Sequence, residues 1–458
     1  MYIEQLYTGC LAEAAYYIES EGEAIIIDPL RETEPYIEMA RARKAKIKYI
    51  FETHFHADFV SGHIDLAHKT GASIVYGPTA KTTYDTIEAK DGQIFELGKI
   101  KIKVLHTPGH TPESSCYLLF DENGKENSIF TGDTLFIGDV GRPDLAQKSG
   151  EITAEDLAAT LYDSLRVKIM PLSDHITVYP GHGAGSSCGK KMSSETSALL
   201  GDQKQTNYAL GDISKEDFVK ELTTGILPPP QYFSKAAAQN KSGYKSIDEL
   251  FESSLKALTP DQMDSSKSLI LDTRHQDDFR KGHIKDSWFV GLDGQFAPWV
   301  GALIEDLHQP IIIVAEVGKE REAIMRLARV GYDNVIGYLE GGIETWFNAG
   351  KSTETLNSIS PEEFAIKGAG QDVILDVRKP SEYADAHIAG SQNAPLDFFV
   401  NTAEMHTNGK LAIHCKGGYR SVIAASILKS KGAAVIDIMG GFDELKKTNL
   451  PIGKTEVV

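Results

Sequence analysis

An internal repeat in the second half of the chain constrains the fold more than any other feature. LILDTR at Leu269–Arg274 returns as VILDVR at Val373–Arg378, and a histidine follows each aspartate eleven positions later. Further on, IIVAEVGKEREA aligns with LAIHCKGGYRSV, so that Glu316 stands opposite Cys415. A Gly-Gly pair follows each of these two residues 25 positions later. Four shared features in one order indicate two copies of the same domain.

Each copy alternates short apolar runs with helical stretches. In the second copy, the apolar run Leu411–His414 leads to Cys415, and Val422–Lys431 has helical character. Strand runs that alternate with helices are typical of small α/β domains with parallel sheets. We therefore expect two such domains.

Composition excludes several classes of protein. The chain has 47 basic and 65 acidic residues, a net charge of -18, which argues against nucleic acid or an anionic membrane as the main partner. No apolar run reaches the ~20 residues of a membrane span, and we read no signal peptide. The 4 cysteines are far apart and rule out a disulfide scaffold, so a cytoplasmic location is expected. Cys10 and Cys116 lie in apolar contexts and are expected in the core.

The first 200 residues also alternate strands with helices. The expected strands are Ala24–Ile27, Ile47–Phe51, Ile100–Leu105, Cys116–Phe120, Ile129–Phe130 and Ile176–Tyr179. The expected helices are Glu34–Lys44, Gly62–Lys69 and Ala154–Leu165. Leu227–Phe233 contains three successive prolines and is expected to form a stiff exit from this domain.

Histidines and aspartates recur where these strands end. The segments are THFHADFVSGH from Thr53, HTPGHTPES from His106, FTGDTLF around Asp133 and YPGHGAGS around His182. Sites in α/β folds are usually built at the carboxyl ends of strands. Imidazole and carboxylate groups together suit zinc, iron or manganese. The pattern predicts a metal site.

In this order, THFHAD, HTPGHT, TGD and GHG resemble the metallo-β-lactamase superfamily over residues 1–230. The resemblance implies an αββα sandwich with the metal at one edge of two packed sheets. Most hydrolytic members carry HxHxDH and bind two metals. Here Phe59 follows Asp58, so a ligand for the second metal is missing.

Within the superfamily the sequence is most similar to the persulfide dioxygenases, which bind a single Fe(II). By position, the resemblance implies His54, His110 and Asp133 as ligands. Two histidines and one carboxylate form the facial triad of non-haem iron oxygenases, which leaves open coordination positions. One Fe(II) per chain is expected, with zinc as a substitute.

Five further residues are expected near this centre. His56, Asp58 and His182 would orient waters and ligands, with direct metal ligation by His56 as the alternative. Arg142, in GDVGRPDL, would meet the anion of a thiol substrate or, equally, support a turn. Cys188 follows His182 by six positions and is a candidate for redox or substrate handling.

Cys415 opens the loop CKGGYRS between a strand and a helix. Backbone N–H groups converge at such a turn and favour a thiolate. Gly417 and Gly418 let the backbone curl around the sulfur, and Arg420 can donate to loop carbonyls or to an oxyanion. The other loop positions are Lys416, Tyr419 and Ser421. We therefore predict a nucleophilic cysteine.

LDVR, AHIAGS and CKGGYRS resemble the rhodanese family. The resemblance implies a persulfide on Cys415 and roles as fold signatures for Asp376, Arg378 and His387. The first copy has Glu316 at the cysteine position, so it is expected to be an inactive domain that packs between or orients the other two. A carboxylate there would also repel anionic sulfur compounds.

The order of these parts resembles the multidomain persulfide dioxygenase–sulfurtransferases. It implies an oxidising domain over 1–235, an inactive rhodanese-like domain over 240–352 and an active one over 355–458. The implied reaction oxidises a thiol persulfide with O₂ to sulfite, and Cys415 then forms or uses thiosulfate in sulfide detoxification. The thiol carrier and the direction of sulfur transfer stay open. A dimer or higher homo-oligomer is expected.

Two other functions compete. One is a di-zinc thioester hydrolase of the glyoxalase II kind, which Phe59 and the rhodanese partner disfavour. The other is a non-catalytic sulfur carrier or sensor in which the metal domain only gates a partner.

Overall fold

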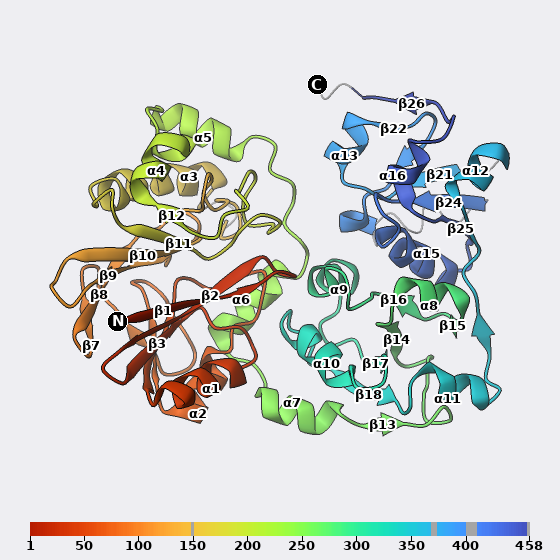
Figure 1. Cartoon of the computed structure of the whole chain (residues 1–458), viewed down its shortest axis with the longest axis horizontal. Helices are drawn as coiled ribbons and strands as arrows, with labels where there is room; N and C mark the ends of the chain where they lie inside the picture. The colour runs from red at the N-terminus through yellow and green to blue at the C-terminus, as the bar shows by residue number, and fades with distance from the viewer. Residues whose placement is uncertain (148–150, 368–372, 400–409, 456–458) are drawn as a thin grey trace. The chain divides into compact units, whose positions relative to one another are not determined.

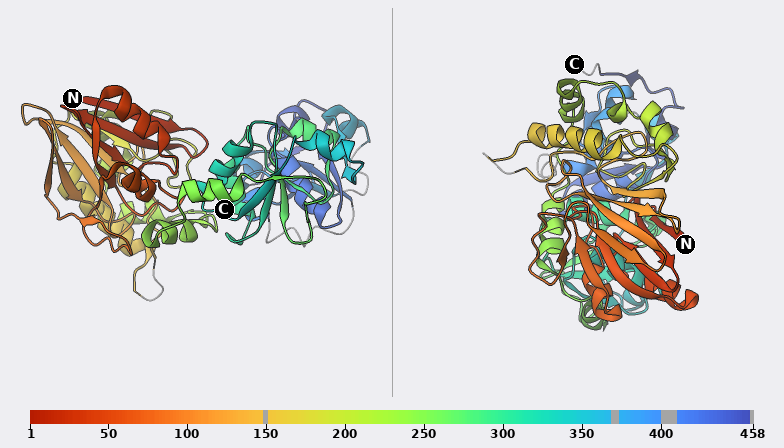
Figure 2. Two further views of the ribbon diagram at one scale, coloured as in Figure 1. Left: turned by 90° about the horizontal axis from the view of Figure 1, so that it is seen from below. Right: turned by 90° about the vertical axis from the view of Figure 1, so that its left-hand side faces the viewer.

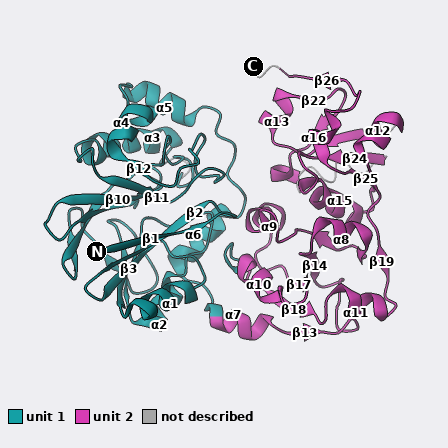
Figure 3. Cartoon of the chain, in the orientation of Figure 1, with its two compact units in different colours: residues 1–247, 328–331 teal, residues 248–327, 332–458 magenta. Residues whose placement is uncertain are grey.

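The computed structural model describes residues 1–147, 151–367, 373–399 and 410–455. The chain forms two compact units, one of residues 1–247 with 328–331 and one of residues 248–327 with 332–458 (Figure 3). Among the described helices, none has the length and apolarity that a membrane crossing demands.

Two six-stranded sheets form the centre of the first unit (Figure 1). The first sheet has the order β1-β2-β3-β4-β5-β6, antiparallel as far as β3 and parallel from there on. Its strands are β1 (Tyr2–Thr8), β2 (Glu13–Ser20), β3 (Glu23–Ile27), β4 (Lys46–Glu52), β5 (Ser73–Tyr76) and β6 (Ile87–Glu88). The second sheet has the order β12-β11-β10-β9-β8-β7, in which β10 and β11 pair in parallel. Its strands are β7 (Ile94–Leu97), β8 (Ile100–His106), β9 (Ser115–Phe120), β10 (Glu126–Gly132), β11 (Thr177–Pro180) and β12 (Ala198–Leu199).

Helices cover the outer faces of the two sheets. They are α1 (Glu34–Arg43), α2 (His63–Thr70), α3 (Ala154–Ser164), α4 (Leu200–Thr206), α5 (Lys215–Thr223) and α6 (Phe233–Ser242), with the short helices η1 (Leu165–Ile169) and η2 (Tyr208–Leu210). Helix α3 begins at a capping box, because Thr153 accepts from the Asp156 N–H and Asp156 accepts in return from the Thr153 N–H. Each strand and helix predicted for this unit is confirmed to within a few residues. The unit also contains elements that were not predicted: β1, β2, β5, β6, β7, β12, α4, α5 and α6.

Alternate residues of the first sheet belong to two different cores. Tyr16 packs against Tyr117 of the second sheet, between the two layers. Its neighbour Tyr17 points the other way and packs with Tyr36 of α1 and Leu66 of α2. The red-orange strands of the first sheet and the orange-brown strands of the second lie against each other in Figure 2.

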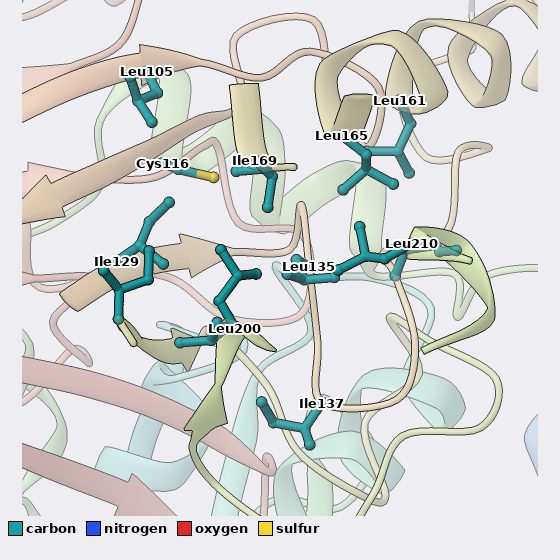
Figure 4. Close-up of a cluster of buried hydrophobic side chains, with 14 of the residues drawn as sticks. Leu105, Cys116, Ile129, Leu135, Ile137, Leu161, Leu165, Ile169, Leu200 and Leu210 are labelled. Carbon is teal, nitrogen blue, oxygen red and sulfur yellow. The ribbon is translucent and has the colours of Figure 1, made fainter. Parts of the chain in front are cut away.

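The outer face of the second sheet packs on α3 and η1. Cys116 and Ile129 point from the strands toward Leu161 and Leu165 of the helical layer (Figure 4). The layers therefore run helix, sheet, sheet, helix, which confirms the αββα sandwich. Cys116 lies in this core, as predicted, and burial raises the pKa of its thiol to about 11.

The second unit contains two domains with the same strand order. The first is β13-β18-β17-β14-β16 and the second is β20-β25-β24-β21-β23, and all neighbours pair in parallel. The first sheet comprises β13 (Ala257–Leu258), β14 (Leu269–Asp272), β16 (Trp288–Phe289), β17 (Ile311–Val314) and β18 (Val335–Leu339). The second comprises β20 (Ser358–Ile359), β21 (Val373–Asp376), β23 (Gln392–Asn393), β24 (Lys410–His414) and β25 (Ala434–Ile438). The repeat in the sequence is thus a repeat of fold.

The remaining elements of the second unit surround these sheets. The helices are α7 (Ile247–Ser254), α8 (Gln276–Lys281), α9 (Phe296–Leu303), α10 (Glu320–Ala328), α11 (Ile343–Asn348), α12 (Pro361–Lys367), α13 (Pro380–Asp385), η3 (Leu396–Phe398), α15 (Arg420–Ser430) and α16 (Gly441–Leu445). The ribbons β15 (His283–Ile284) with β19 (Thr353–Glu354), and β22 (His387–Ile388) with β26 (Ile452–Gly453), occupy equivalent places in the two domains.

Candidate functional site

Three side chains from three strand ends converge in the first unit. His54 follows β4, His110 lies between β8 and β9, and Asp133 follows β10. All three are buried, and their nearest ligand atoms lie within 4.8 Å of one another. The Asp133 Oδ2 atom is 3.5 Å from His110 Nε2 and 3.9 Å from His54 Nε2.

None of these three atoms has a hydrogen-bond partner among the described residues. Buried polar atoms are nearly always paired, so three unpaired atoms aimed at one point indicate a place for a cation. Burial lowers the pKa of His54 well below its usual value and so keeps the imidazole neutral, the form that binds metal. The set fits one divalent transition metal.

In His110 and His54, the ring nitrogen that does not face the common point, Nδ1, is close to a neighbouring oxygen. The His110 Nδ1–H donates to the Arg142 carbonyl oxygen at 2.7 Å, which leaves the Nε2 lone pair free. His54 Nδ1 lies 3.0 Å from Thr53 Oγ1, and this hydroxyl donates to Asp28 at 2.8 Å. Such outer contacts fix the tautomer and the direction of metal ligands.

His182 bridges two carboxylates. Its Nδ1 is 2.7 Å from Asp133 Oδ1 and its Nε2 is 2.8 Å from Asp58 Oδ2. Burial alone would lower the pKa of His182, but the charges of Asp133 and Asp58 raise it well above its ordinary value. In return His182 outweighs the effect of burial on Asp133 and lowers the pKa of that carboxyl. The pair keeps Asp133 ionised.

His56 belongs to a separate buried group with Asp28 and Glu52. Its Nε2 lies 3.0 Å from Asp28 Oδ1 and 3.5 Å from Glu52 Oε2. The ring of Phe59 stacks on the His56 ring, with centroids 4.3 Å apart. Neither ring nitrogen of His56 has a hydrogen-bond partner among the described residues, so His56, Asp28 and Glu52 form a second buried group with atoms placed as cation ligands could be.

Asp58, His182 and Cys188 form a third buried group, with ligand atoms within 4.8 Å of one another. Cys188 is therefore next to the candidate metal centre, as its place in the sequence suggested. Burial, together with the charges of Asp58 and Asp133, raises the pKa of the Cys188 thiol well above its usual value.

Arg142 is buried, and its guanidinium is held by protein groups. It donates to both carboxylate oxygens of Asp144 at 2.6 and 2.7 Å, and to the carbonyls of Ser187 and Leu227. These contacts support the turn-supporting role that the sequence left open, and its carbonyl orients His110.

The Cys415 loop connects β24 to α15 in the second unit. The thiol is buried, and the Gly418 N–H donates to its Sγ at 3.1 Å. Gly441, from the repeated Gly-Gly pair, packs on this loop, because a Cβ there would lie 2.4 Å from the Cys415 carbonyl oxygen. The Gly-Gly feature of the repeat thus supports the cysteine loop.

A cavity of about 230 Å³ opens beside Cys415. Its lining includes Gly417, Arg420 and Lys379 from the same domain, and Gln295 and Trp299 from the domain with Glu316. Gln295 and Trp299 carry no local sequence signal and were not predicted.

The remaining loop residues take different positions. Arg420 forms a two-point ion pair with Glu382, at 2.7 and 3.0 Å. The Tyr419 hydroxyl donates to the Gly291 carbonyl at 2.7 Å. Lys416 is exposed and Ser421 is buried.

The chain belongs to the metallo-beta-lactamase superfamily, whose family model matches residues 8–182. The rhodanese-like domain model matches residues 257–349 and 360–448, so two rhodanese-like domains follow the metallo-beta-lactamase domain. A solved metallo-beta-lactamase structure from Staphylococcus aureus subsp. aureus COL is 32% identical and covers 74% of this chain and 98% of its own, with a TM-score of 0.65.

Curated relatives of the first domain carry two different names. A cytoplasmic hydroxyacylglutathione hydrolase from Arabidopsis thaliana is 34% identical over 178 residues, which are 38% of this chain and 65% of that protein. The human mitochondrial persulfide dioxygenase ETHE1 is 29% identical over 220 residues, which are 48% of this chain and 78% of that protein. The comparisons therefore show a metallo-beta-lactamase enzyme with rhodanese-like domains.

Proposed function

We propose that this chain is an iron-dependent persulfide dioxygenase coupled to a sulfurtransferase. The terminal sulfur of a low-molecular-weight thiol persulfide is oxidised by O₂, and with one water the products are sulfite, free thiol and two protons. The proposal assigns this step to residues 1–235, an organising role to 240–352 and sulfur transfer to 355–458. The similarity to the human persulfide dioxygenase and the domain order support it.

One observation carries the proposal. His54, His110 and Asp133 direct three unpaired atoms at one point, while His56 lies in a separate buried group with Asp28 and Glu52 and its ring is stacked on Phe59. A single metal bound by two imidazoles and one carboxylate keeps several coordination positions free for small ligands. Bound Fe(II) would supply the redox chemistry that activates O₂.

The surrounding residues prepare this site. The Arg142 carbonyl holds His110 in one tautomer, and His182 keeps Asp133 ionised. The three ligand side chains are at most 2% exposed, so their environment excludes bulk water and strengthens electrostatic interactions.

Cys415 is the proposed carrier of sulfane sulfur. Its thiolate attacks the terminal sulfur of a persulfide, the S–S bond breaks, and the thiol leaves with the electron pair. Sulfite can then attack the outer sulfur of the Cys415 persulfide, which releases thiosulfate and regenerates the thiolate. The Gly418 N–H stabilises the negative charge on sulfur.

The alternative is hydrolysis of a thioester by two zinc ions. The hydroxyacylglutathione hydrolase relatives favour it, and Asp58, His182 and Cys188 form a further buried group of possible ligands beside the triad. Iron-reconstituted chain, prepared without oxygen, should consume O₂ and form sulfite with glutathione persulfide or coenzyme A persulfide. Two zinc ions per chain, no O₂ consumption and hydrolysis of S-lactoylglutathione would establish the alternative instead.

Asp133→Ala should separate the two activities. Loss of the only carboxylate in the triad should lower iron affinity by about 100-fold or more and abolish O₂ consumption. Sulfur transfer from thiosulfate to cyanide by Cys415 should persist. Metal analysis, oxygen electrode traces and a thiocyanate assay measure the three quantities, with the exposed Asp163→Ala as the control. Loss of both activities in a folded Asp133→Ala chain would contradict the assignment of two separate sites.

A further inference from the structure

The rhodanese-like domain that lacks a cysteine contacts the Cys415 loop through an arginine. Arg280 lies in the last turn of helix α8, and its side chain is 11% exposed. Its Nη2–H donates to the Gly418 carbonyl oxygen at 3.0 Å, and its Nε–H donates to Asp437 at 2.9 Å. A charged donor to a carbonyl is a strong hydrogen bond.

Gly418 is the residue whose N–H donates to Cys415 Sγ at 3.1 Å. Its two backbone polar groups thus serve two purposes, because the N–H meets the sulfur and the C=O meets Arg280. Gly418 has a φ of +94°, and without a Cβ its backbone has wide conformational freedom. The bond from Arg280 is a contact from outside the loop that can hold this N–H on the sulfur.

Further contacts from the same domain support this anchor. Tyr419, the next loop residue, donates its hydroxyl to Gly291 and packs its ring over Gly294, where a Cβ would lie 2.3 Å from the ring. Gln295 and Trp299 line the cavity beside the thiol. The loop is enclosed on this side by the domain with Glu316.

We propose that Arg280 is a positioning residue for Cys415: it holds the Gly418 peptide so that the Gly418 N–H stays on the sulfur. The inference rests on the proposed sulfur transfer at Cys415 and extends it, because it gives the cysteine-free domain a direct part in that site. Loss of Arg280 leaves Gly418 free to rotate, and the thiolate loses a donor.

The competing explanation for the position of Arg280 is that it only forms an ion pair with Asp437 and has no effect on the Cys415 loop. Asp437 is buried and lies 2.8 Å from Arg280 Nη2, so the guanidinium could serve only to neutralise it. Removal of Arg280 alone would leave a buried unpaired carboxylate, which destabilises proteins. The double variant Arg280→Met with Asp437→Asn removes this charge pair and leaves no buried unpaired carboxylate, because Asp277, the other partner of Arg280, is 57% exposed. Asp437→Asn alone keeps the bond from Arg280 to Gly418.

The test measures the reactivity of the Cys415 thiol in the full chain. Iodoacetamide labelling of the Cys415 peptide is followed by mass spectrometry between pH 5 and pH 9. For Arg280→Met, and for the double variant, the midpoint of the pH profile should rise by about half a unit to one unit. The labelling rate at pH 6 should fall by about three- to tenfold.

Three variants serve as controls. Arg280→Lys retains one charged donor and should recover part of the shift. Asp437→Asn should change the rate less than twofold. Lys281→Met should also have little effect, because Lys281 is the next residue on α8, is 75% exposed and pairs only with Asp278 among the described residues.

Two results would overturn the proposal. One is an unchanged profile in the folded double variant. The other is an equal shift for Asp437→Asn and Arg280→Met, which would assign the effect to the ion pair. Labelling does not require sulfur transfer, so a shift in a chain that fails the thiocyanate assay would leave the positioning role intact and remove only the proposed function.

Discussion

The two rhodanese-like domains share their framework and differ at the loop that carries the chemistry. In the first, Arg274 donates to both oxygens of Asp272 and to the Gly282 carbonyl. In the second, Arg378 makes the same three contacts, with Asp376 and Ala386. The Asp–Arg feature that the two copies share thus stabilises each domain and does not identify the reacting group.

The histidines at matching positions of the two domains, His283 and His387, also make the same contacts. His283 stacks on Phe279, and His387 stacks on Tyr383, each with ring centroids 3.9 Å apart. Each also lies 2.8 Å, through Nδ1, from the carbonyl of the residue on which it stacks. Both are therefore fixed in the framework, which supports the role of fold signature expected for His387.

The loops themselves diverge in position and in partners. Cys415 is buried, whereas Glu316 is exposed. Arg420 pairs with Glu382, whereas the guanidinium of Arg321 lies over the ring of Phe251. A domain can therefore lose its reacting group and its loop contacts while its sheet and its buried Asp–Arg pair persist.

The largest effect should come from exchanging the reacting residues. Cys415→Ser should lower sulfur transfer by about 1,000-fold or more, because the nucleophile is lost. Glu316→Cys, made in the Cys415→Ser chain, should restore nothing, because position 316 is exposed and the Arg321 guanidinium lies over the Phe251 ring. A thiocyanate assay measures both, and O₂ consumption is the control that should survive. Sulfur transfer by the chain with Glu316→Cys and Cys415→Ser would contradict this prediction, because it would show that both loops can activate a cysteine.

The buried Asp–Arg pairs should contribute equally to the stability of the two domains. Arg274→Met and Arg378→Met each leave a buried carboxylate unpaired, which should lower the free energy of unfolding by about 3–5 kcal/mol. Urea unfolding followed by circular dichroism measures both. Tryptophan fluorescence reports on the first domain and its contacts with the second, because the 3 tryptophans of the chain, Trp288, Trp299 and Trp346, all lie in the first, and Trp288 donates to Ser430 of the second. Markedly unequal losses would mean that the shared contacts carry different weight in the two domains.

The smallest expected effect is on the pH dependence of stability, through the ion pair between Glu382 and Arg420. Burial alone would raise its pKa, but the hydrogen bonds and charge of Arg420 lower it. The ionised pair therefore stabilises the fold above the unfolded pKa of Glu382, and this stability is lost as the pH falls through its lower folded pKa. Glu382→Gln should destabilise by up to about 1 kcal/mol at pH 7, with the difference vanishing at acidic pH. Asp278→Asn, at the matching position of the first domain, should have no effect, because Asp278 pairs with the exposed Lys281. Thermal unfolding at several pH values measures both variants.

The strands and the polar residues at their ends have local signals, and the resemblance to the metallo-β-lactamase superfamily implied the layers and the choice of His54, His110 and Asp133. Apolar runs mark β4, β8 and β10, and polar residues at their ends must meet at one edge of the sandwich. β1 and β2 were not predicted, although β2 contains the buried apolar run AAYYI within EAAYYIES.

Contacts between distant segments had no such signal. Asp28 supports His54 through Thr53, and Arg280 contacts Gly418 across 138 positions of the chain. Arg142 shows a different limit. Its charge fitted an anion site and a turn-supporting role equally, and the sequence did not reveal that its partner is Asp144, two positions away. Sequence patterns identified the groups but not which neighbours they had already engaged.

The stack of Phe59 on His56 also bears on what a histidine at position 59 would do. Phe59→His would place a second imidazole beside His56, whose Nε2 lies 3.0 Å from Asp28 and 3.5 Å from Glu52. For both imidazoles to bind one further metal beside the triad, the His56 ring would have to turn away from these two buried carboxylates. The substitution at position 59 would therefore also require a rearrangement at position 56.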